Sequence, residues 1–256
     1  MIDTHAHLNL GEFDGDRNEV ADICRKLNIE VINVGIDYLS SIKAIEIAEA
    51  REGFYASVGI HPNTQEDIEA IEPLFAKRKV VAVGETGLDF LRIKNDKIEQ
   101  ERQRSLMIQH GELARKYKLP LIIHCRKAYV DLLFLLRRNL SDQVGVIHSF
   151  SGSLSDAREL LNMGYYLGFN GLIFKFNLDE VIESTPIERI LTETDSPFLP
   201  PPFLNNPRNA PHLGLKAVLE KIAFLKRIPV SEVESITVQN AYSLFKLNNH
   251  GKISTS

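Results

Sequence analysis

The sequence has few cysteines and no long hydrophobic run, and each of these absences excludes a class of protein. Only Cys24 and Cys125 occur among its 256 residues, which excludes a disulfide framework and fits a reducing compartment. No apolar run approaches the roughly 20 residues that a membrane-spanning helix needs. The N-terminus has no basic, apolar signal segment. We therefore expect a cytoplasmic protein that does not associate with membranes.

An excess of positive charge is also lacking, since the formal net charge is −4. Proteins that hold nucleic acid along a broad groove are usually basic, because neutralising phosphates supplies much of their affinity. If this chain acts on DNA, we expect it to bind a few phosphates near a strand end, weakly and transiently. The sequence contains no pattern that indicates an obligate protein partner.

The length and composition are those of a globular protein. The sequence is 44% hydrophobic and 25% charged. Its 256 residues suffice for one (β/α)8 barrel, which needs about 250, although two ordinary domains would also fit. The proline-rich segment 197–211 is too short for a linker between domains. We predict a single domain over residues 1–256, with a disordered tail after about residue 248.

Short β-rich runs alternate with helical patterns as far as Asp195. Val80–Val83 and Leu121–Ile123 are continuous apolar runs, which are typical of parallel strands covered by helices. Eight such strands with seven intervening helical patterns favour an α/β fold of the (β/α)8 (TIM) barrel type over an open sheet. The expected strands are Ile2–His5, Val31–Gly35, Tyr55–Gly59, Val80–Gly84, Leu121–His124, Val144–His148, Tyr165–Gly168 and Ile190–Glu193.

Two further helical patterns follow the last strand. They cover Leu213–Lys226 and Ser231–Leu247. In the second, Ser231 and Glu234 have the spacing of a capping box, in which each side chain bonds to the backbone N–H of the other residue. We therefore expect this helix to begin at Ser231.

Histidines and acids recur at the ends of the predicted strands. His5 and His7 form a His-x-His pair at the end of the first strand, so both point to the same side of the sheet. In a closed barrel, all such strand ends surround one mouth, where barrel enzymes build their active sites. Imidazole nitrogens and carboxylate oxygens are suitable ligands for divalent ions. The predicted metal ligands are His5, His7, Glu85, His124, His148 and Asp195.

Any one of these histidines could simply be a polar group that caps a strand, but that reading does not explain six residues in phase. Six ligands are too many for one tetrahedral ion and suit a pair of divalent ions, Mg²⁺, Mn²⁺ or Zn²⁺, with Glu85 as the bridge. Two ions about 3.5–4 Å apart can bind the attacking and leaving oxygens of a displacement at phosphorus. Asp195 would bind one ion and orient or deprotonate the attacking water. Glu85 and Asp195 are thus the predicted catalytic residues.

Seven motifs stand in order along nearly the whole chain: DTHAHL (3–8), GIHP (59–62), GETGLDF (84–90), HCR (124–126), HSFSG (148–152), ETDSP (193–197) and NAYSLF (240–245). Together they resemble the TatD family of metal-dependent deoxyribonucleases. The resemblance implies an amidohydrolase-like (β/α)8 fold, hydrolysis of DNA phosphodiester bonds, often as a 3′→5′ exonuclease, and the same six metal ligands.

Two positions depart from the pattern of this family. The family often has Arg-Asn-Glu-Pro after the eighth strand, where this chain has Ala210 in place of the acid. It also often has cysteine where Thr86 stands. Neither position is a predicted ligand, so we expect hydrolysis to be retained. The change at Ala210 bears on substrate preference.

Three further residues are predicted to contact a substrate phosphate. His61 would donate a hydrogen bond, although it could instead stabilise its loop. Arg126 and Arg208 would bind phosphate through paired N–H donors, and the alternative for each is a solvated surface arginine.

Several residues near the predicted mouth have supporting interpretations. Asp89 is expected to hold a loop or a ligand, because metal-binding side chains need such partners. Phe90 and Phe203 are candidates for stacking on a base. Cys125 and His110 are interpreted as structural, and the sequence gives His110 no partner.

Two other functions remain open at this point. One is an amidohydrolase-type enzyme that acts on a small amide, lactone or phosphate ester, because a fold does not fix a function. Many such enzymes bridge their metals with a modified lysine on the fourth strand. Glu85 takes that place here, which favours the nuclease. The other is a non-catalytic scaffold, which an intact set of buried polar ligands disfavours, because such groups are costly to bury without a role.

Overall fold

The eight apolar runs form eight parallel strands, and each strand begins within one residue of its expected start. The structure, a computed structural model, describes residues 1–93 and 95–247, so the tail expected to be disordered lies outside the described residues. The strands lie side by side in the order β1 to β8. They are β1 (Ile2–Ala6), β2 (Glu30–Val34), β3 (Phe54–Val58), β4 (Val80–Asp89), β5 (Leu121–Arg126), β6 (Gly145–Ile147), β7 (Tyr166–Phe169) and β8 (Ile190–Thr192).

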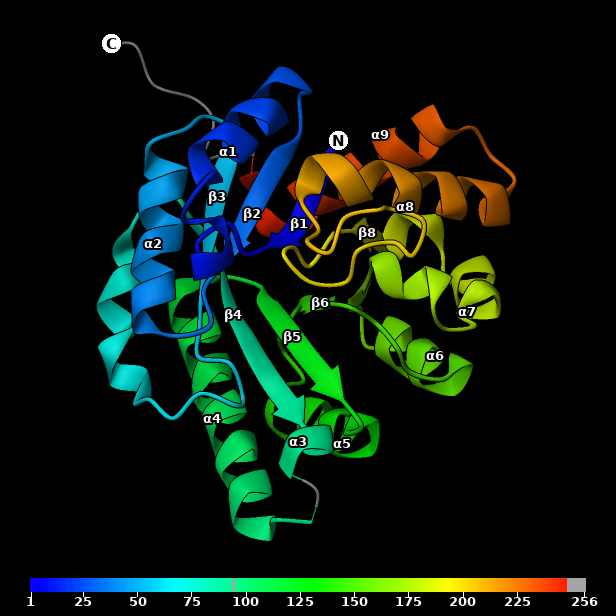
Figure 1. Ribbon diagram of the computed structural model, residues 1–256. Helices are drawn as coiled ribbons and strands as arrows, with labels where there is room; N and C mark the ends of the chain where they lie inside the picture. Colours follow the sequence, from blue (N-terminus) through cyan, green and yellow to red (C-terminus); the bar gives the residue numbers. More distant parts are fainter. Residues whose placement is uncertain (94, 248–256) are drawn as a thin grey trace.

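The first strand and the segment after the eighth strand meet and nearly close the barrel. Ala6 and Ser196 form a parallel bridge. The His7 N–H donates to the Ser196 carbonyl at 2.7 Å, and the Asp195 N–H donates to the His5 carbonyl at 2.9 Å. These contacts join the ends of the sheet at the residues predicted to bind metal. They confirm the (β/α)8 barrel (Figure 1).

The helices lie between the strands along the chain and surround the barrel (Figure 1). Within the described residues, none of them is both long and apolar enough to cross a membrane. They are α1 (Arg17–Lys26), α2 (Tyr38–Glu49), α3 (Phe90–Ile93), α4 (Lys97–Tyr117), α5 (Tyr129–Asn139), α6 (Leu154–Asn162), α7 (Asp179–Ser184), α8 (Pro211–Lys226) and α9 (Val230–Phe245).

The connection from β3 to β4 differs from the expected helix. It contains only the short 3-10 turns η2 (Ile68–Ala70) and η3 (Glu72–Ala76). Its apolar residues Ile68, Ile71 and Phe75 are spaced as on a helix, and all three are buried. This spacing explains why the sequence pattern predicts a helix there.

The capping box predicted for α9 is wrong. The helix begins at Val230, with Pro229 at its cap, and no side chain caps it. Glu234 instead accepts a hydrogen bond from the N-terminal ammonium of Met1 at 2.9 Å. A charge-assisted bond of this kind is stronger than a bond to a neutral backbone N–H, so it determines where the Glu234 carboxylate lies.

Helix α9 packs against the amino ends of the strands. Phe245 belongs to the same buried cluster as Ile2, the first residue of β1, and Ile32, which lies within β2. The Asn240 side chain donates to the carbonyl of Ile190, the first residue of β8, at 2.9 Å. This end of the barrel is therefore covered, and the ligands lie at the opposite end.

Strand β4 continues past its expected end at Gly84, so Glu85 lies within the strand and not at its terminus. Gly84 has a φ of +140°, and a Cβ there would lie 2.4 Å from the Ile122 carbonyl oxygen. A Cβ on Gly59 would lie 2.4 Å from the Gly84 backbone. Glycines at both positions let β3, β4 and β5 approach closely, which brings Glu85 toward the ligands on the neighbouring strands.

Candidate metal centre

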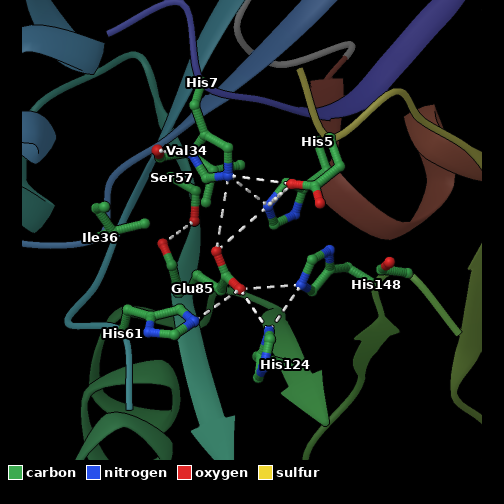
Figure 2. A network of polar contacts seen from close by, with 12 residues as sticks. His5, His7, Val34, Ile36, Ser57, His61, Glu85, His124 and His148 are labelled. Carbon is green, nitrogen blue, oxygen red and sulfur yellow. Dashed lines mark hydrogen bonds and ion pairs between the residues drawn. The ribbon is translucent and has the colours of Figure 1, made fainter. Parts of the chain in front are cut away.

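Glu85 lies at the centre of the site, and its two carboxylate oxygens face different histidines (Figure 2). Oε2 lies 3.4 Å from His5 Nε2 and 3.8 Å from His7 Nε2. Oε1 lies 2.9 Å from His124 Nδ1 and 2.9 Å from His148 Nε2. One carboxylate is thus shared between two pairs of imidazoles, one from β1 and one from β5 and the end of β6.

Asp195 joins the first of these two pairs. Its Oδ1 lies 3.3 Å from His7 Nε2 and 3.8 Å from His5 Nε2. His5 also stacks on His148 with the ring centroids 3.8 Å apart, so the two halves of the site are in contact. The fold therefore brings all six sequence-predicted ligands together, and subsets such as His5, His7 and Glu85 have the spacing of a metal site.

The outer nitrogens of three histidines face acceptors, which leaves the inner nitrogens available as ligands. His7 Nδ1 donates to a carbonyl oxygen of β2 at 2.8 Å, so its Nε2 keeps a lone pair directed into the site. His124 Nε2 lies 3.6 Å from Asp89 Oδ2, and His148 Nδ1 lies 3.5 Å from Glu193 Oε1. Partners of this kind orient metal-binding imidazoles, and Asp89 has the supporting position expected for it.

The inner nitrogens are close to one another. His5 Nε2 and His7 Nε2 are 3.1 Å apart, and His124 Nδ1 and His148 Nε2 are 3.3 Å apart. Lone pairs at such distances repel unless a proton or another cation lies with them. Nitrogen and carboxylate ligands packed in this way fit divalent metal ions.

The charges in the site are coupled. Burial raises the pKa of Glu85, but His148 and His61 outweigh burial and hold it well below the usual range. Burial lowers the pKa of His148, but Glu85 and Glu193 hold it well above its usual value. Without a metal ion, the protein therefore favours an ionised Glu85 carboxylate beside a protonated His148 imidazole. A metal ion that binds His148 would displace this proton.

Glu193 lies beside His148, and no role was predicted for it from the sequence. It is fully buried, and its Oε1 accepts the Ser149 N–H at 2.7 Å and the Asn170 side-chain amide at 3.1 Å. These bonds fix the carboxylate that faces His148. Its place in the ETDSP motif, two positions before Asp195, was the signal that could have indicated this role.

His61 lies at the edge of the site. Its Nε2 is 3.6 Å from Glu85 Oε1, and its Nδ1 accepts the Asn63 N–H at 3.1 Å. Because Nδ1 is an acceptor, the proton of the neutral ring is on Nε2, which points into the site. Burial lowers the pKa of His61 to about 4, although Glu85 opposes that shift. His61, Glu85 and His124 also have the spacing of a metal site.

His110, which the sequence analysis left without a partner, supports the loop that carries His61. Its Nδ1 donates to the Leu106 carbonyl at 2.8 Å, and its Nε2 accepts the Ile60 N–H at 3.0 Å. Burial lowers the pKa of His110 to about 4, so the ring is neutral near pH 7. Sequence patterns could not show this partner, because it is the backbone of a residue 50 positions away.

The two arginines predicted to bind substrate differ in their surroundings. Arg126 is exposed at the end of β5 and makes no ion pair with any residue that the structure describes. The Arg208 guanidinium donates to the Asp16 carboxylate, at 2.9 Å for one of two bonds, and lies over the Phe13 ring, 4.4 Å from its centroid. The donors of Arg208 are therefore engaged with the protein.

Comparison with known proteins places this barrel among its relatives. The family model described as "TatD related DNase" matches residues 2–246. YabD of Bacillus subtilis (strain 168), named an uncharacterized metal-dependent hydrolase, is 38% identical, covering 97% of this chain and 100% of the relative. TatD of Edwardsiella piscicida, named a 3′-5′ ssDNA/RNA exonuclease, is 32% identical, covering 96% of this chain and 100% of the relative.

A solved structure of a relative has the same fold. The crystal structure of YjjV, a TatD homologue from Escherichia coli K12, superposes with a TM-score of 0.87 and 31% identity, covering 96% of this chain and 98% of that one. The match of the family model over nearly the whole chain, with relatives above 30% identity, agrees with the metal-binding geometry. The chain therefore belongs to the TatD family of metal-dependent hydrolases.

Proposed function

We propose that this protein hydrolyses the phosphodiester bonds of DNA and removes nucleotides from the 3′ end, using two divalent metal ions. The observation that carries the proposal is the position of Glu85, whose two oxygens each face a separate pair of imidazoles. A carboxylate in this position can bridge two ions. The name of the Edwardsiella piscicida relative supports the substrate and the direction of cleavage.

The ligands divide into two sets around that bridge. His5, His7 and Asp195 would hold one ion together with Glu85, and His124 and His148 would hold the other, also with Glu85. When bound, such a pair supplies Lewis-acid stabilisation at phosphorus and lowers the pKa of a bound water. Four imidazoles favour Zn²⁺, while the two carboxylates also suit Mn²⁺ and Mg²⁺.

Asp195 is the residue that would orient the attacking water and take its proton. Burial raises the pKa of Asp195, but its bond with His7 and the charge of His148 outweigh burial and lower it. The side chain is therefore held as a carboxylate, the form that accepts a proton. Its φ of +54° places it at the turn after β8, beside the end of β1.

His61 and Arg126 are the residues that would hold the substrate phosphate. A neutral His61 has an N–H at Nε2 directed into the site. Arg126 presents an exposed guanidinium at the end of β5, and its paired donors match two phosphate oxygens. Arg208 would have to leave Asp16 before it could do the same.

The test uses a single-stranded DNA oligomer labelled at its 5′ end, incubated with Mg²⁺, Mn²⁺ or Zn²⁺. A chelated sample and the Asp195→Asn variant are the controls. We expect a ladder that shortens from the 3′ end and disappears in both controls. If protein shown to contain metal leaves the oligomer intact, the proposal is wrong, and a panel of small phosphate esters, lactones and amides is the next assay.

A further inference from the structure

An exposed aromatic ring contacts His7, one of the predicted metal ligands. Phe198 lies three residues beyond Asp195, and 46% of its surface is exposed. Its ring packs edge-to-face against the ring of His7, with the centroids 6.1 Å apart. An apolar surface is therefore presented to solvent next to one of the predicted ligands.

The backbone around Phe198 is tied to the catalytic segment. The Phe198 N–H donates to the Asp195 carbonyl at 2.8 Å. The side-chain amide of Asn209 donates to the Leu199 carbonyl at 3.3 Å and to the Thr194 carbonyl at 3.1 Å. These bonds hold the backbone of Phe198 beside Asp195, and the edge-to-face contact with His7 places its ring against one of the predicted ligands.

A second exposed ring stands on the same loop. Phe203 is 63% exposed, and its edge contacts Phe174 with the ring centroids 5.2 Å apart. Phe174 in turn packs against the hydrophobic core. A single exposed apolar side chain needs no explanation, but the loop after β8 exposes two aromatic rings, and Phe198 is the one in contact with a predicted ligand.

We propose that Phe198 is a stacking platform for the nucleobase next to the scissile phosphate. This inference rests on the proposed nuclease function. A protein with a net charge of −4 gains little affinity from phosphates, so stacking supplies binding that charge does not. Every base has an aromatic face, so the platform binds a strand end of any sequence.

The test compares two oligomers that differ only in the two bases at the 3′ end. The nucleotides on either side of the terminal phosphodiester carry thymine in the first and 5,6-dihydrothymine in the second. Dihydrothymine keeps the same polar groups but lacks the flat aromatic ring. We expect the wild type to cleave the thymine oligomer with a kcat/KM roughly 5-fold or more above that for the other, since stacking contributes on that order.

Three variants separate stacking from structure. Phe198→Leu should lose this preference because its KM for the thymine oligomer rises. The KM for the dihydrothymine oligomer and the metal content of the protein should not change. Phe198→Trp should retain the preference. Phe224→Leu, at a residue 79% exposed near the far end of α8, is the matched control and should behave as wild type.

Either of two results would overturn the inference. The first is that stacking makes no difference: the wild type shows no preference, or Phe198→Leu keeps the preference, or Phe198→Leu cleaves both oligomers more slowly by the same factor. In the second, wild-type protein with bound metal cleaves neither oligomer, which refutes the nuclease function itself and the platform with it.

Discussion

The carboxylate of Asp3 accepts hydrogen bonds from both the backbone N–H and the hydroxyl of Thr194, at 3.0 and 2.6 Å. It also accepts the N–H of His5 at 3.2 Å. The two bonds with Thr194 connect β1 with the segment after β8, at the seam where the barrel closes, and the bond with His5 lies within β1. They therefore fix the distance between the β1 ligands and Asp195.

Removing this carboxylate should loosen the seam. Asp3→Ala removes the acceptor of two buried N–H groups and leaves the Thr194 hydroxyl only the Ser196 hydroxyl as a partner, and we expect it to lower the free energy of unfolding by about 2–4 kcal/mol. Asp3→Asn keeps an acceptor and should cost less. Urea unfolding of both variants measures the effect. Equal stability of Asp3→Ala and wild type would show that the seam does not depend on these bonds.

Glu193 should matter for metal affinity more than for folding. In Glu193→Gln, the neutral amide oxygen can still accept the Ser149 N–H, but the negative charge facing His148 is lost. Changes in such supporting groups typically weaken metal binding by about 10–100-fold. Titration of the chelated protein with Mn²⁺ or Zn²⁺ measures this loss. Wild-type affinity in the variant would mean that Glu193 only holds the loop.

Metal binding should release protons. Burial lowers the pKa values of His124 and His148, but nearby carboxylates, Asp89 and Glu85 respectively, more than offset it and leave both raised. These rings remain protonated to a higher pH and must lose the proton to bind metal. Apparent affinity should thus rise with pH, for example from about pH 6 to about pH 8. Calorimetry in two buffers of different ionisation enthalpy counts the protons, and no release would contradict the assigned charges.

His110 should make the free energy of unfolding depend on pH in the acid range. Its pKa is about 4 in the folded protein, against a usual value of 6.5. Between these values the unfolded chain binds a proton that the native state does not, so the free energy of unfolding falls as pH falls through this window. Above it, His110 contributes no pH dependence.

The variant His110→Gln should flatten this dependence. Between about pH 7 and about pH 5, it should lose roughly 2 kcal/mol less stability than the wild type. Urea unfolding at both pH values, with chelator present in all samples, isolates the effect from metal binding. An identical loss in the two proteins would mean that the ring is not neutral in the folded state.

The two arginines should separate substrate binding from stability. Arg126→Ala removes an exposed guanidinium at the end of β5, and we expect a KM for DNA about 10-fold higher with unfolding unchanged. Arg208→Ala breaks the pair with Asp16 and its contact with Phe13, and should lower stability by about 1 kcal/mol with little effect on KM. If Arg208→Ala raised KM and Arg126→Ala lowered stability, Arg208 would be the residue that binds substrate and Arg126 the structural one.

The local pattern of the sequence was enough to predict the strands and to single out six residues that the fold brings together. Continuous apolar runs mark parallel strands, and polar residues at their carboxyl ends must meet at one end of a closed barrel. His5, His7, His124, His148 and Asp195 lie at or near such ends, whereas Glu85 lies within β4, and the motifs around all six residues point to the TatD family.

Partners distant in sequence were not predictable from the pattern. The capping box at Ser231 failed because Glu234 bonds to Met1 instead. His110 appeared to lack a partner because it accepts from the backbone of Ile60. Both outcomes depend on which buried or charged group lies nearest after folding.

The sequence by itself thus determined the class of fold and the chemical nature of the ligands, because both depend on periodicity and residue type. Only the tertiary structure decided that each oxygen of Glu85 faces its own pair of imidazoles, and that Arg208 is paired with Asp16. The reason is geometric. Distances of a few ångströms between side chains on different strands depend on register, backbone approach and rotamer, which no single segment of the chain encodes.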